Sequence, residues 1–397
     1  MPRSLWLLVI GTIINVTASS FLWPLNTIYI HDELGKSLTT AGFVLMLNAG
    51  ASVAGNLFGG VLFDKIGGYK SILFGIVITM LPLVCLIVNH SWMVYVIALI
   101  VIGFGTGVVF PATYAMAGSV WPEGGRKAFN AVYVAQNFGV ALGSALGGLV
   151  ASYSFEWIFL ANGLLYAVFF LVVFFGFRNI GVQTINPASV IQRSKMEKNK
   201  SKLLALTFIA AGYLLCWIAY VQWQSTIAAY TQKVHISLTQ YSLLWTINGA
   251  LIVLAQPLVS WFVKHAAKSL KKQMIIGIAI FMVSFGAAAA AEDFRGFFIA
   301  MVILTIGEMF VWPAVPTIAN DLAPKGREGF YQGFINSTAT GGRMIGPLLG
   351  GALADAFSMP VLFGVLLGLL IAGMVFTIVY DRPLKAEEKE KKVAVSS

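Results

Sequence analysis

Long apolar segments recur along the whole chain, and they constrain its fold more than any other feature. Each is about as long as the roughly 20 residues that a helix needs to cross about 30 Å of hydrocarbon. The chain is 58% hydrophobic and only 11% charged over its 397 residues, so little polar sequence separates the segments. In hydrocarbon only helices and closed barrels satisfy every backbone hydrogen bond, and these segments are too long and too apolar for barrel strands. We therefore predict an all-α integral membrane protein.

Twelve membrane spans are predicted from the alternation of apolar and polar sequence. They cover approximately residues 4–30, 38–63, 70–89, 92–118, 127–152, 156–178, 203–231, 238–263, 272–291, 296–320, 328–355 and 358–380. The first has no cleavage site, so we expect an uncleaved helix rather than a signal peptide. One long polar segment separates six spans from six. The expected organisation is an N-terminal six-helix bundle (1–178), a linker (179–202), a C-terminal six-helix bundle (203–381) and a tail (382–397).

The distribution of basic residues predicts the orientation of these spans. Of the 26 lysines and arginines, 22 fall on the side of the two termini, whereas Lys36, Lys233 and Arg295 fall on the other side and Arg343 lies within a span. The positive-inside rule then places both termini, the linker and the tail in the cytoplasm of a multi-pass cell-membrane protein. The net charge of +10 is explained by these orientation signals and by anionic lipid headgroups, so it does not require nucleic acid as a partner.

The two halves of the chain resemble each other at a nearly constant offset, as is common in transporters. Trp23, Asn48 and Asn56 fall on Trp223, Asn248 and Gln256 at an offset of 200, Pro111 and Pro122 fall on Pro313 and Pro324 at 202, and residues 143–148 fall on 346–351 at 203. Each half contains an even number of predicted spans. The sequence therefore predicts two pseudo-symmetric bundles of parallel topology.

Two opposite charges lie inside predicted spans, and they are candidates for proton coupling. Glu308 and Arg343 each lie near the middle of a span, where an ionisable side chain costs at least a few kcal/mol and so indicates a function. Burial favours the protonated form of a carboxyl group, whereas a nearby guanidinium favours the ionised form. Glu308 would exchange a proton if its distance to Arg343 changed during transport, or if substrate competed for either side chain. The alternative is a static ion pair that fixes the packing of the two spans.

Polar and aromatic residues within the spans predict a substrate cavity. Asn130, Tyr133 and Asn137 share one helix face at i, i+3 and i+7, and Gln332, Asn336 and Arg343 share another at i, i+4 and i+11. Further amide and aromatic groups come from Trp23, Asn26, Asn48, Tyr114, Tyr220, Trp223, Asn248 and Trp312. Helix packing or an interfacial position explains any one of these residues. Together they form the mixture that lines mostly apolar ligand pockets.

Two glycine motifs predict a latch and close helix contacts. The connection between the second and third spans contains Gly60, Asp64, Lys65, Gly67 and Lys70. There Gly60 permits close packing, Asp64 can accept hydrogen bonds at a helix end, and Gly67 permits a tight reversal. Small residues also recur in the fifth span (Gly139, Gly143, Gly147 and Gly148) and in the eleventh (Gly342, Gly346, Gly350 and Gly351), where Pro347 would bend the helix. Alone, an ordinary charged turn and generic helix packing would explain these patterns.

Together the motifs resemble those of the major facilitator superfamily. The Gly60–Lys70 segment is similar to its cytoplasmic signature, and the fifth-span glycines resemble the antiporter motif of its drug/proton exchangers. The resemblance implies the fold of that superfamily and a latch, formed by the residues of this segment, that helps to hold the outward-facing state. The sequence departs from the exchangers in two places, because Ser144 replaces the motif's proline and the fourth span lacks their usual arginine.

The expected function is a monomeric secondary transporter that exports small amphipathic organic molecules by alternating access, driven by protons. One alternative is a facilitator or symporter of a defined metabolite (a sugar, an organic anion or an amino acid), with Arg343 binding a substrate carboxylate. Another is a non-transporting membrane sensor or a membrane-embedded enzyme. The sequence shows no nucleotide-binding glycine loop, the two cysteines lie within apolar runs, and the four histidines are scattered. We therefore expect no enzymatic activity, cofactor or metal, and the expected partners are substrate, protons and lipid.

Overall fold

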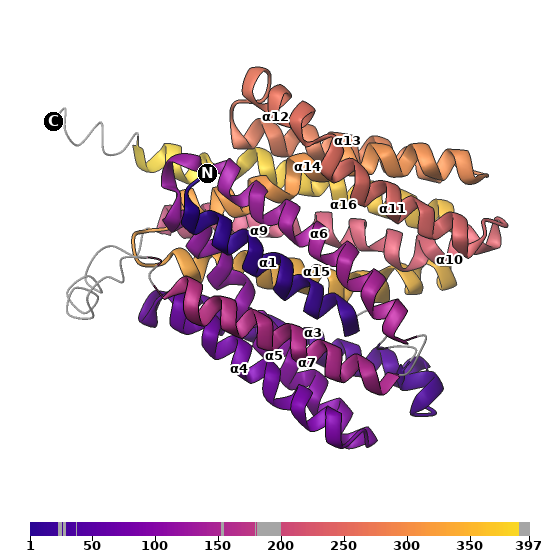
Figure 1. The fold of residues 1–397 in the computed structure, drawn as a ribbon. Helices are drawn as coiled ribbons and strands as arrows, with labels where there is room; N and C mark the ends of the chain where they lie inside the picture. Colours follow the sequence, from indigo (N-terminus) through magenta and orange to yellow (C-terminus); the bar gives the residue numbers. More distant parts are fainter. Residues whose placement is uncertain are drawn as a thin grey trace. The chain divides into compact units, whose positions relative to one another are not determined.

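The chain folds almost entirely into helices, as seen in a computed structural model that describes residues 1–22, 26, 29–36, 38–151, 155–178, 180 and 200–388. These residues contain no strand. The elements, shown in Figure 1, are α1 (Arg3–Leu22), η2 (Tyr29–Glu33), α3 (Leu38–Ile66), α4 (Gly68–Val88), α5 (Trp92–Val120), η3 (Pro122–Gly124), α6 (Arg126–Ala151), α7 (Phe155–Val172), η4 (Val173–Phe177), α9 (Lys200–Tyr220), η5 (Val221–Gln224), α10 (Thr226–Lys233), α11 (Leu238–Leu254), α12 (Gln256–His265), α13 (Leu270–Ala289), α14 (Phe294–Leu322), α15 (Glu328–Ala356) and α16 (Met359–Val379). The predicted all-α fold is confirmed.

Most of the predicted spans correspond to helices that can cross a bilayer. Within the described residues nine helices are long and apolar enough, and α11 with α12 makes a tenth candidate that is bent by 54°. The sequence predicted one continuous span there, but Pro257 stands at the start of α12, where a missing N–H group allows the helix to break. The remaining two predicted spans, α6 and α15, are 26 and 29 residues long but less apolar, because they carry the glycines and many of the predicted cavity residues.

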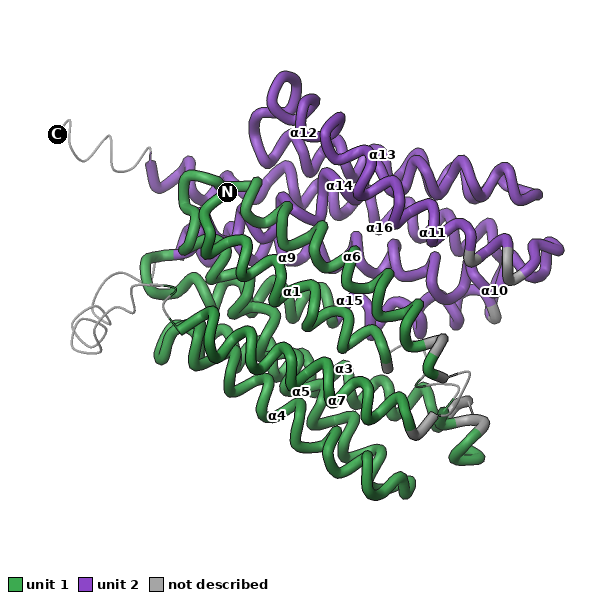
Figure 2. Tube along the Cα trace, in the orientation of Figure 1, with its two compact units in different colours: residues 1–194, 324–340 green, residues 195–323, 341–397 purple. Residues whose placement is uncertain are grey.

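The described helices form two compact units, which are coloured separately in Figure 2. The first contains residues 1–194 and 324–340, and the second contains residues 195–323 and 341–397. The N-terminal part of α15 therefore groups with the first unit and the rest of α15 with the second. The predicted linker lies outside the described residues except for residues 180 and 200–202, and so does the tail beyond residue 388.

In the first unit α5 packs along both α3 and α4, and α1 packs along α6 and α7. The core contains large apolar side chains with little exposed surface, among them Leu5, Leu8, Phe129, Phe159 and Phe169. Other large apolar side chains, such as Leu81 and Leu164, are exposed. A protein in water would bury them, whereas lipid contact requires them.

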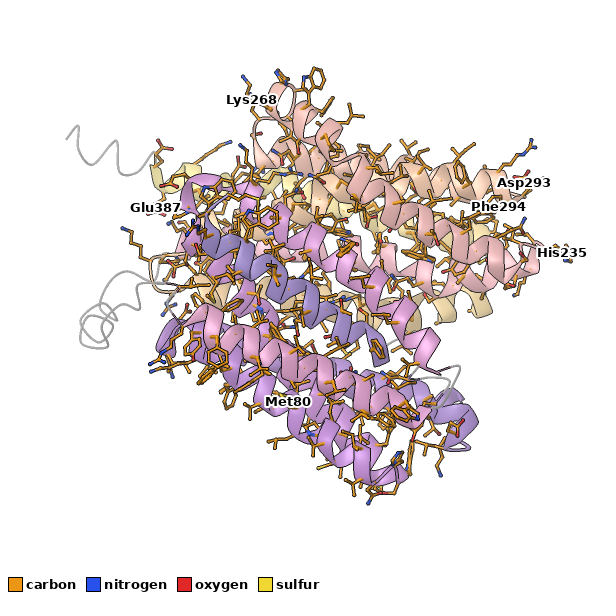
Figure 3. All side chains as sticks on the ribbon, viewed as in Figure 1. Met80, His235, Lys268, Asp293, Phe294 and Glu387 are labelled. Carbon is orange, nitrogen blue, oxygen red and sulfur yellow. The ribbon has the colours of Figure 1, made fainter. Side chains whose placement is uncertain are left out.

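In the second unit α13 packs along α14 and α16, α9 along α16, and α11 along α14. Figure 3 labels polar and charged side chains at opposite ends of these helices: His235 and Asp293 lie at one end, and Lys268 and Glu387 at the other. The latter two belong to the side that the sequence predicts to be cytoplasmic. Polar ends with apolar helices between them are what a bilayer requires.

Candidate functional site

Glu308, in α14, is the centre of the candidate site, and its side chain is only 2% exposed. One carboxylate oxygen accepts a hydrogen bond from the side-chain amide of Asn248 on α11, and the other accepts one from the indole N–H of Trp312 at 3.0 Å. The hydroxyl group of Tyr220, at the end of α9, is a third hydrogen-bond partner. Three helices of the second unit thus converge on one buried carboxyl group.

The local sequence of α14 explains how this network is held in place. Thr305, Glu308 and Trp312 share one helix face at i, i+3 and i+7. The hydroxyl group of Thr305 donates to the carbonyl oxygen of Met301 at 2.8 Å, and its oxygen accepts from the Asn248 amide at 3.0 Å. The amide nitrogen of Asn248 therefore donates to two neighbouring side chains. Both hydrogen bonds fix the amide beside Glu308.

Aromatic rings surround the Trp312 side of the carboxyl group. Trp217 stacks on Trp312 with 4.6 Å between ring centroids and an interplanar angle of 10°. Three further rings lie around Trp312, namely Tyr220 at 5.3 Å, Phe281 at 5.4 Å and Tyr213 at 5.5 Å. The carboxyl group therefore lies at the edge of a cluster of five rings.

Arg343 joins this cluster through Trp217. Its guanidinium carbon lies 4.8 Å from the centroid of the Trp217 ring. The sequence predicted Arg343 as the direct partner of Glu308. In the contacts that the structure describes, the two residues are connected through the stacked rings of Trp217 and Trp312, and Trp312 then donates to Glu308.

Glycines on α15 bring Arg343 to α9. A Cβ atom at Gly342 would lie only 2.6 Å from Cβ of Trp217 and 3.1 Å from the carbonyl oxygen of Leu214. One turn later, the side-chain amide of Gln222 donates to the carbonyl oxygen of Gly346 at 2.6 Å. In the first unit the glycines of α6 lie against α1 in the same way, because a Cβ atom at Gly139 would lie 2.9 Å from the carbonyl oxygen of Ile13. The two halves of the predicted repeat therefore make corresponding glycine contacts between helices.

Asp64, in the predicted latch, lies against the first turn of α15. Its two carboxylate oxygens accept hydrogen bonds from the backbone N–H groups of Gly329 at 2.8 Å and Phe330 at 2.9 Å. N–H groups at a helix N-terminus have no partner within the helix and carry partial positive charge, so they bind an anion well. Gly60 and Gly329 face each other so closely that neither position has room for a Cβ atom.

The other latch residues lie around this contact. Gly67 has a φ of 82°, in the left-handed region that favours glycine, and it joins α3 to α4. Lys65 and Lys70 are exposed. The contact with the start of α15 could not be read from the motif, because nothing in the sequence pairs position 64 with position 329.

The predicted cavity residues divide into groups. Tyr220, Asn248 and Trp312 lie around Glu308 as described. Several others bond to backbone or to a neighbouring side chain: Asn48 donates to the carbonyl oxygen of Leu99 at 2.5 Å, Asn137 to that of Tyr133 at 2.9 Å, Asn336 to that of Gln332 at 2.9 Å, Tyr95 to the Asn26 side chain at 2.9 Å, and Tyr114 to the Gln136 side chain at 2.9 Å. These contacts fit helix packing as well as a cavity.

Four predicted cavity residues remain, besides Trp23, which lies outside the described residues. Tyr133 and Gln332 are buried, and Asn130 is partly buried. Trp223 is fully buried, and its carbonyl oxygen accepts a hydrogen bond from Tyr241 at 2.5 Å.

Sequence reasoning missed Tyr213, Trp217, Phe281 and Thr305. A signal was present for two of them, because Tyr213, Trp217 and Tyr220 share a helix face at i, i+4 and i+7. Phe281 and Thr305 look like ordinary residues of apolar helices, so only the fold reveals them. Among the described residues no group of three histidine, cysteine, aspartate or glutamate side chains could hold a metal ion.

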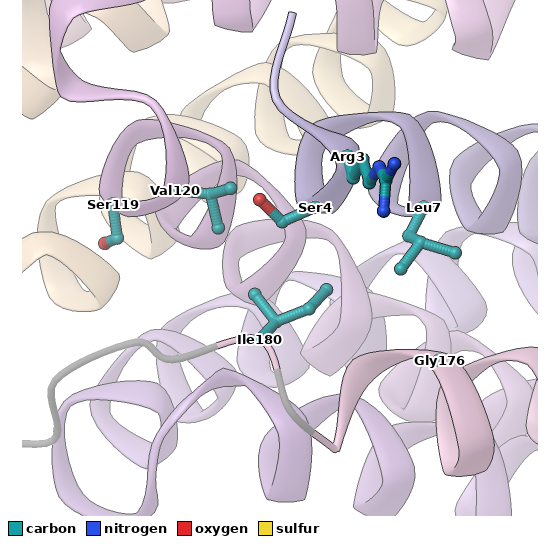
Figure 4. A pocket seen from close by; sticks show the side chains of 7 residues that line it. All are labelled: Arg3, Ser4, Leu7, Ser119, Val120, Gly176 and Ile180. Carbon is teal, nitrogen blue, oxygen red and sulfur yellow. The ribbon is translucent and has the colours of Figure 1, made fainter.

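A cavity of about 410 Å³ lies elsewhere, at the helix ends of the first unit. Figure 4 shows its lining, which comes from the start of α1 (Arg3, Ser4 and Leu7), the end of α5 (Ser119 and Val120), Gly176 and Ile180. None of these residues belongs to the predicted substrate cavity. The lining of this cavity shares no residue with the Glu308 network.

Comparisons with known proteins agree with this architecture. The family model described as Major Facilitator Superfamily matches residues 8–265 and 212–396. The chain is 62% identical over 398 residues to the "Uncharacterized MFS-type transporter YttB" of Bacillus subtilis (strain 168), with 100% of both chains covered. It is 24% identical over 403 residues to the "Quinolone resistance protein NorA" of Staphylococcus aureus (strain COL), covering 98% of this chain and 100% of that protein. The crystal structure of the human organic anion transporter MFSD10 (TETRAN) shares the fold, with a TM-score of 0.73, 15% identity, and 95% of this chain and 100% of that chain covered.

Proposed function

Since the chain belongs to the major facilitator superfamily of transporters, we propose that it exports small amphipathic organic molecules in exchange for protons. The superfamily predicted from the motifs is confirmed, and the protein is a multi-pass membrane transporter rather than an enzyme. The substrate class, the direction of transport and the coupling to protons are the proposal. The cell membrane, with both termini in the cytoplasm, is its proposed location.

The buried carboxyl group of Glu308 is the observation that carries the proposal. A carboxylate only accepts hydrogen bonds, and the indole N–H of Trp312 only donates, so this contact stabilises the ionised form. A protonated carboxyl group needs an acceptor for its own O–H, and the hydroxyl oxygen of Tyr220 can serve as one. The site therefore offers partners to both protonation states, which a residue that loads and releases a proton requires.

The position of α15 suggests how the proton site is linked to alternating access. The first turn of α15 binds Asp64, and its middle carries Arg343 on the Trp217–Trp312 stack. A shift of this one helix would release the Asp64 contact and also disturb the stack that ends on Glu308. Protonation of Glu308 and the latch would then respond to each other through α15.

Two lines of support favour an organic substrate. Five aromatic rings lie beside Glu308, and such rings contact flat or apolar molecules over large areas. The Staphylococcus aureus relative is named for resistance to quinolones, which are organic compounds. A metabolite symporter is the second candidate, favoured by the exposure of Arg343.

A screen of cells that overproduce the protein tests this function. We expect the parent to raise resistance to some amphipathic toxic compounds and to speed their loss from preloaded cells, and Glu308→Gln to do neither at equal amounts of folded protein. Glu292→Gln is the matched control, because Glu292 is exposed in a connection between helices. Protein-dependent uptake of the compounds down the proton gradient would instead identify a symporter, and resistance retained by Glu308→Gln would contradict the proposal.

A further inference from the structure

We infer that Arg343 binds an anionic group of the substrate, so that the transported compounds pair a carboxylate or similar oxyanion with a flat aromatic or apolar body. This inference rests on the proposed transport function and narrows its substrate class. It follows from the depth, the exposure and the stacking of Arg343, and each of these is independent of proton coupling.

The depth and exposure of Arg343 are the first argument. Arg343 lies near the middle of α15, yet its side chain is exposed, whereas Glu308 is buried. An arginine exposed to lipid at that depth is strongly unfavourable, so arginines inside membrane proteins face the bundle interior or a water-filled cavity. The guanidinium of Arg343 is therefore accessible from an aqueous path, as a substrate-binding group must be.

The stacking of Arg343 on Trp217 is the second argument. The guanidinium carbon of Arg343 lies 4.8 Å from the centroid of the Trp217 ring, which is within the range of a cation–π contact. The N–H donors of a guanidinium lie in its plane, in a fork that matches the two oxygens of a carboxylate. Stacking also restricts the long side chain before substrate arrives, so less conformational entropy is lost on binding.

The residues around Arg343 supply the remainder of such a site. Gly341 and Gly342 precede it and have no side chains to cover it, and the rings of Trp217 and Tyr213 lie on the facing helix α9. The acid of the cluster, Glu308, is held by Asn248, Trp312 and Tyr220. An anionic substrate with a flat body would therefore meet a cation and aromatic faces together, whereas a cationic substrate would be repelled by Arg343.

The internal repeat supports a functional role for this pair. At the offsets that align the two halves, Arg343 corresponds to Val140 and Trp217 corresponds to Thr17. The glycine contacts between α1 and α6 nevertheless form without an arginine or a tryptophan at these positions. The shared helix packing does not need Arg343 and Trp217, so they serve something other than that packing.

Matched ligands test the inference by equilibrium binding to the purified full chain in lipid nanodiscs, without a pH gradient. The probes are naphthalene, indole and biphenyl carboxylic acids, with the methyl ester and the primary amine of each body. We expect some acids to bind about tenfold or more tightly than their esters, and the amines to bind more weakly. Arg343→Gln should abolish the preference for the acids while the esters still bind, Arg343→Lys should retain only part of the preference, and the exposed Arg295→Gln should match the parent.

Several results would overturn the inference. The first is that the acid binds no better than its ester in every series. The second is that the preference for acids survives in Arg343→Gln, and the third is that no acid binds. The ester affinity and the elution profile of Arg343→Gln report whether that variant is folded. An acid preference lost in Arg343→Gln supports the inference even if transport proves independent of protons. Proton-driven export restricted to neutral compounds would uphold the proposed function and contradict this inference.

Discussion

Asp64 is a residue whose role depends on having two acceptor oxygens. Each oxygen receives one backbone N–H group, from Gly329 and from Phe330. Hydrogen bonds to a charged group contribute about 1.5–3 kcal/mol each, and an amide in the same place would offer one acceptor and turn its NH2 group toward a donor. The contact is therefore specific for a carboxylate.

For Asp64→Asn we predict near-normal insertion and amounts of protein but slower transport, because a contact between helices is weakened while no span is altered. The measurement is the initial transport rate at matched expression. Glu292→Gln is the control, since Glu292 is exposed and lies outside the latch segment. An unchanged rate in Asp64→Asn would show that the contact is not needed for the transport cycle.

Single residues also show where sequence reasoning succeeds and where it stops. A charge inside an apolar run is rare, so Glu308 and Arg343 could be selected from the sequence. Trp217 carries a weaker signal, the helix face that it shares with Tyr213 and Tyr220, because an aromatic residue in an apolar helix is common. Its importance comes from Trp312 and Arg343 on other helices. Asn48 stays a prediction, because its amide bonds to the backbone of α5, a contact that fits helix packing as well as a cavity.

Among the helices, α9 and α15 depend on glycine for their contact. A Cβ atom at Gly342 would lie 2.6 Å from Cβ of Trp217, an atom that no rotamer change can move. At the neighbouring Gly341 the nearest atom would be a methyl carbon of Leu214 at 3.9 Å, which is ordinary contact. Gly342 therefore has no room for a Cβ atom, whereas Gly341, its neighbour in the same helix, does have room.

We predict that Gly342→Ala destabilises the protein by about 1–3 kcal/mol, because the helices must separate to admit the methyl group. Gly341→Ala should be neutral or stabilising by about 0.5–1 kcal/mol, because alanine favours a helix more than glycine does. The measurement is the fraction of each variant that stays monodisperse after heating. Equal stability of the two variants would refute the close α9–α15 contact.

The elements also show the limits of apolar periodicity. Apolar length predicted the helices in which lipid contact dominates, such as α4 and α16. Apolar length did not predict that the span 238–263 is broken, because Pro257 lies within an otherwise apolar segment. Apolar length predicts α6 and α15 only weakly, because their glycine and polar faces pack against protein rather than lipid.

Across the whole molecule, the two halves of the repeat share their glycine contacts between helices, but they differ at the position of Glu308. Glycines of α6 meet α1, and glycines of α15 meet α9. Yet at the offset of 202 the counterpart of Glu308 is Thr106, so the repeat has no acid at the corresponding position of the first half. The proposed coupling therefore belongs to one half of a two-fold architecture.

The orientation of the molecule can be tested by cysteine labelling. With Cys85 and Cys216 replaced, we predict that a membrane-impermeant maleimide labels Lys233→Cys in intact cells and labels Glu388→Cys only after permeabilisation. Both positions are exposed, and the asymmetry of basic residues places them on opposite sides of the membrane. Labelling of Glu388→Cys from outside intact cells would reverse the orientation.

The central claim is that Glu308 couples transport to protons, and everted membrane vesicles with an acidified interior test it most directly. The account predicts that the parent accumulates a substrate identified in the resistance screen, that accumulation collapses when an uncoupler removes the pH gradient, and that Glu292→Gln behaves like the parent. Glu308→Gln, present in the same amount and eluting as a folded protein, should show no gradient-driven accumulation. Accumulation by folded Glu308→Gln equal to that of the parent would contradict the account.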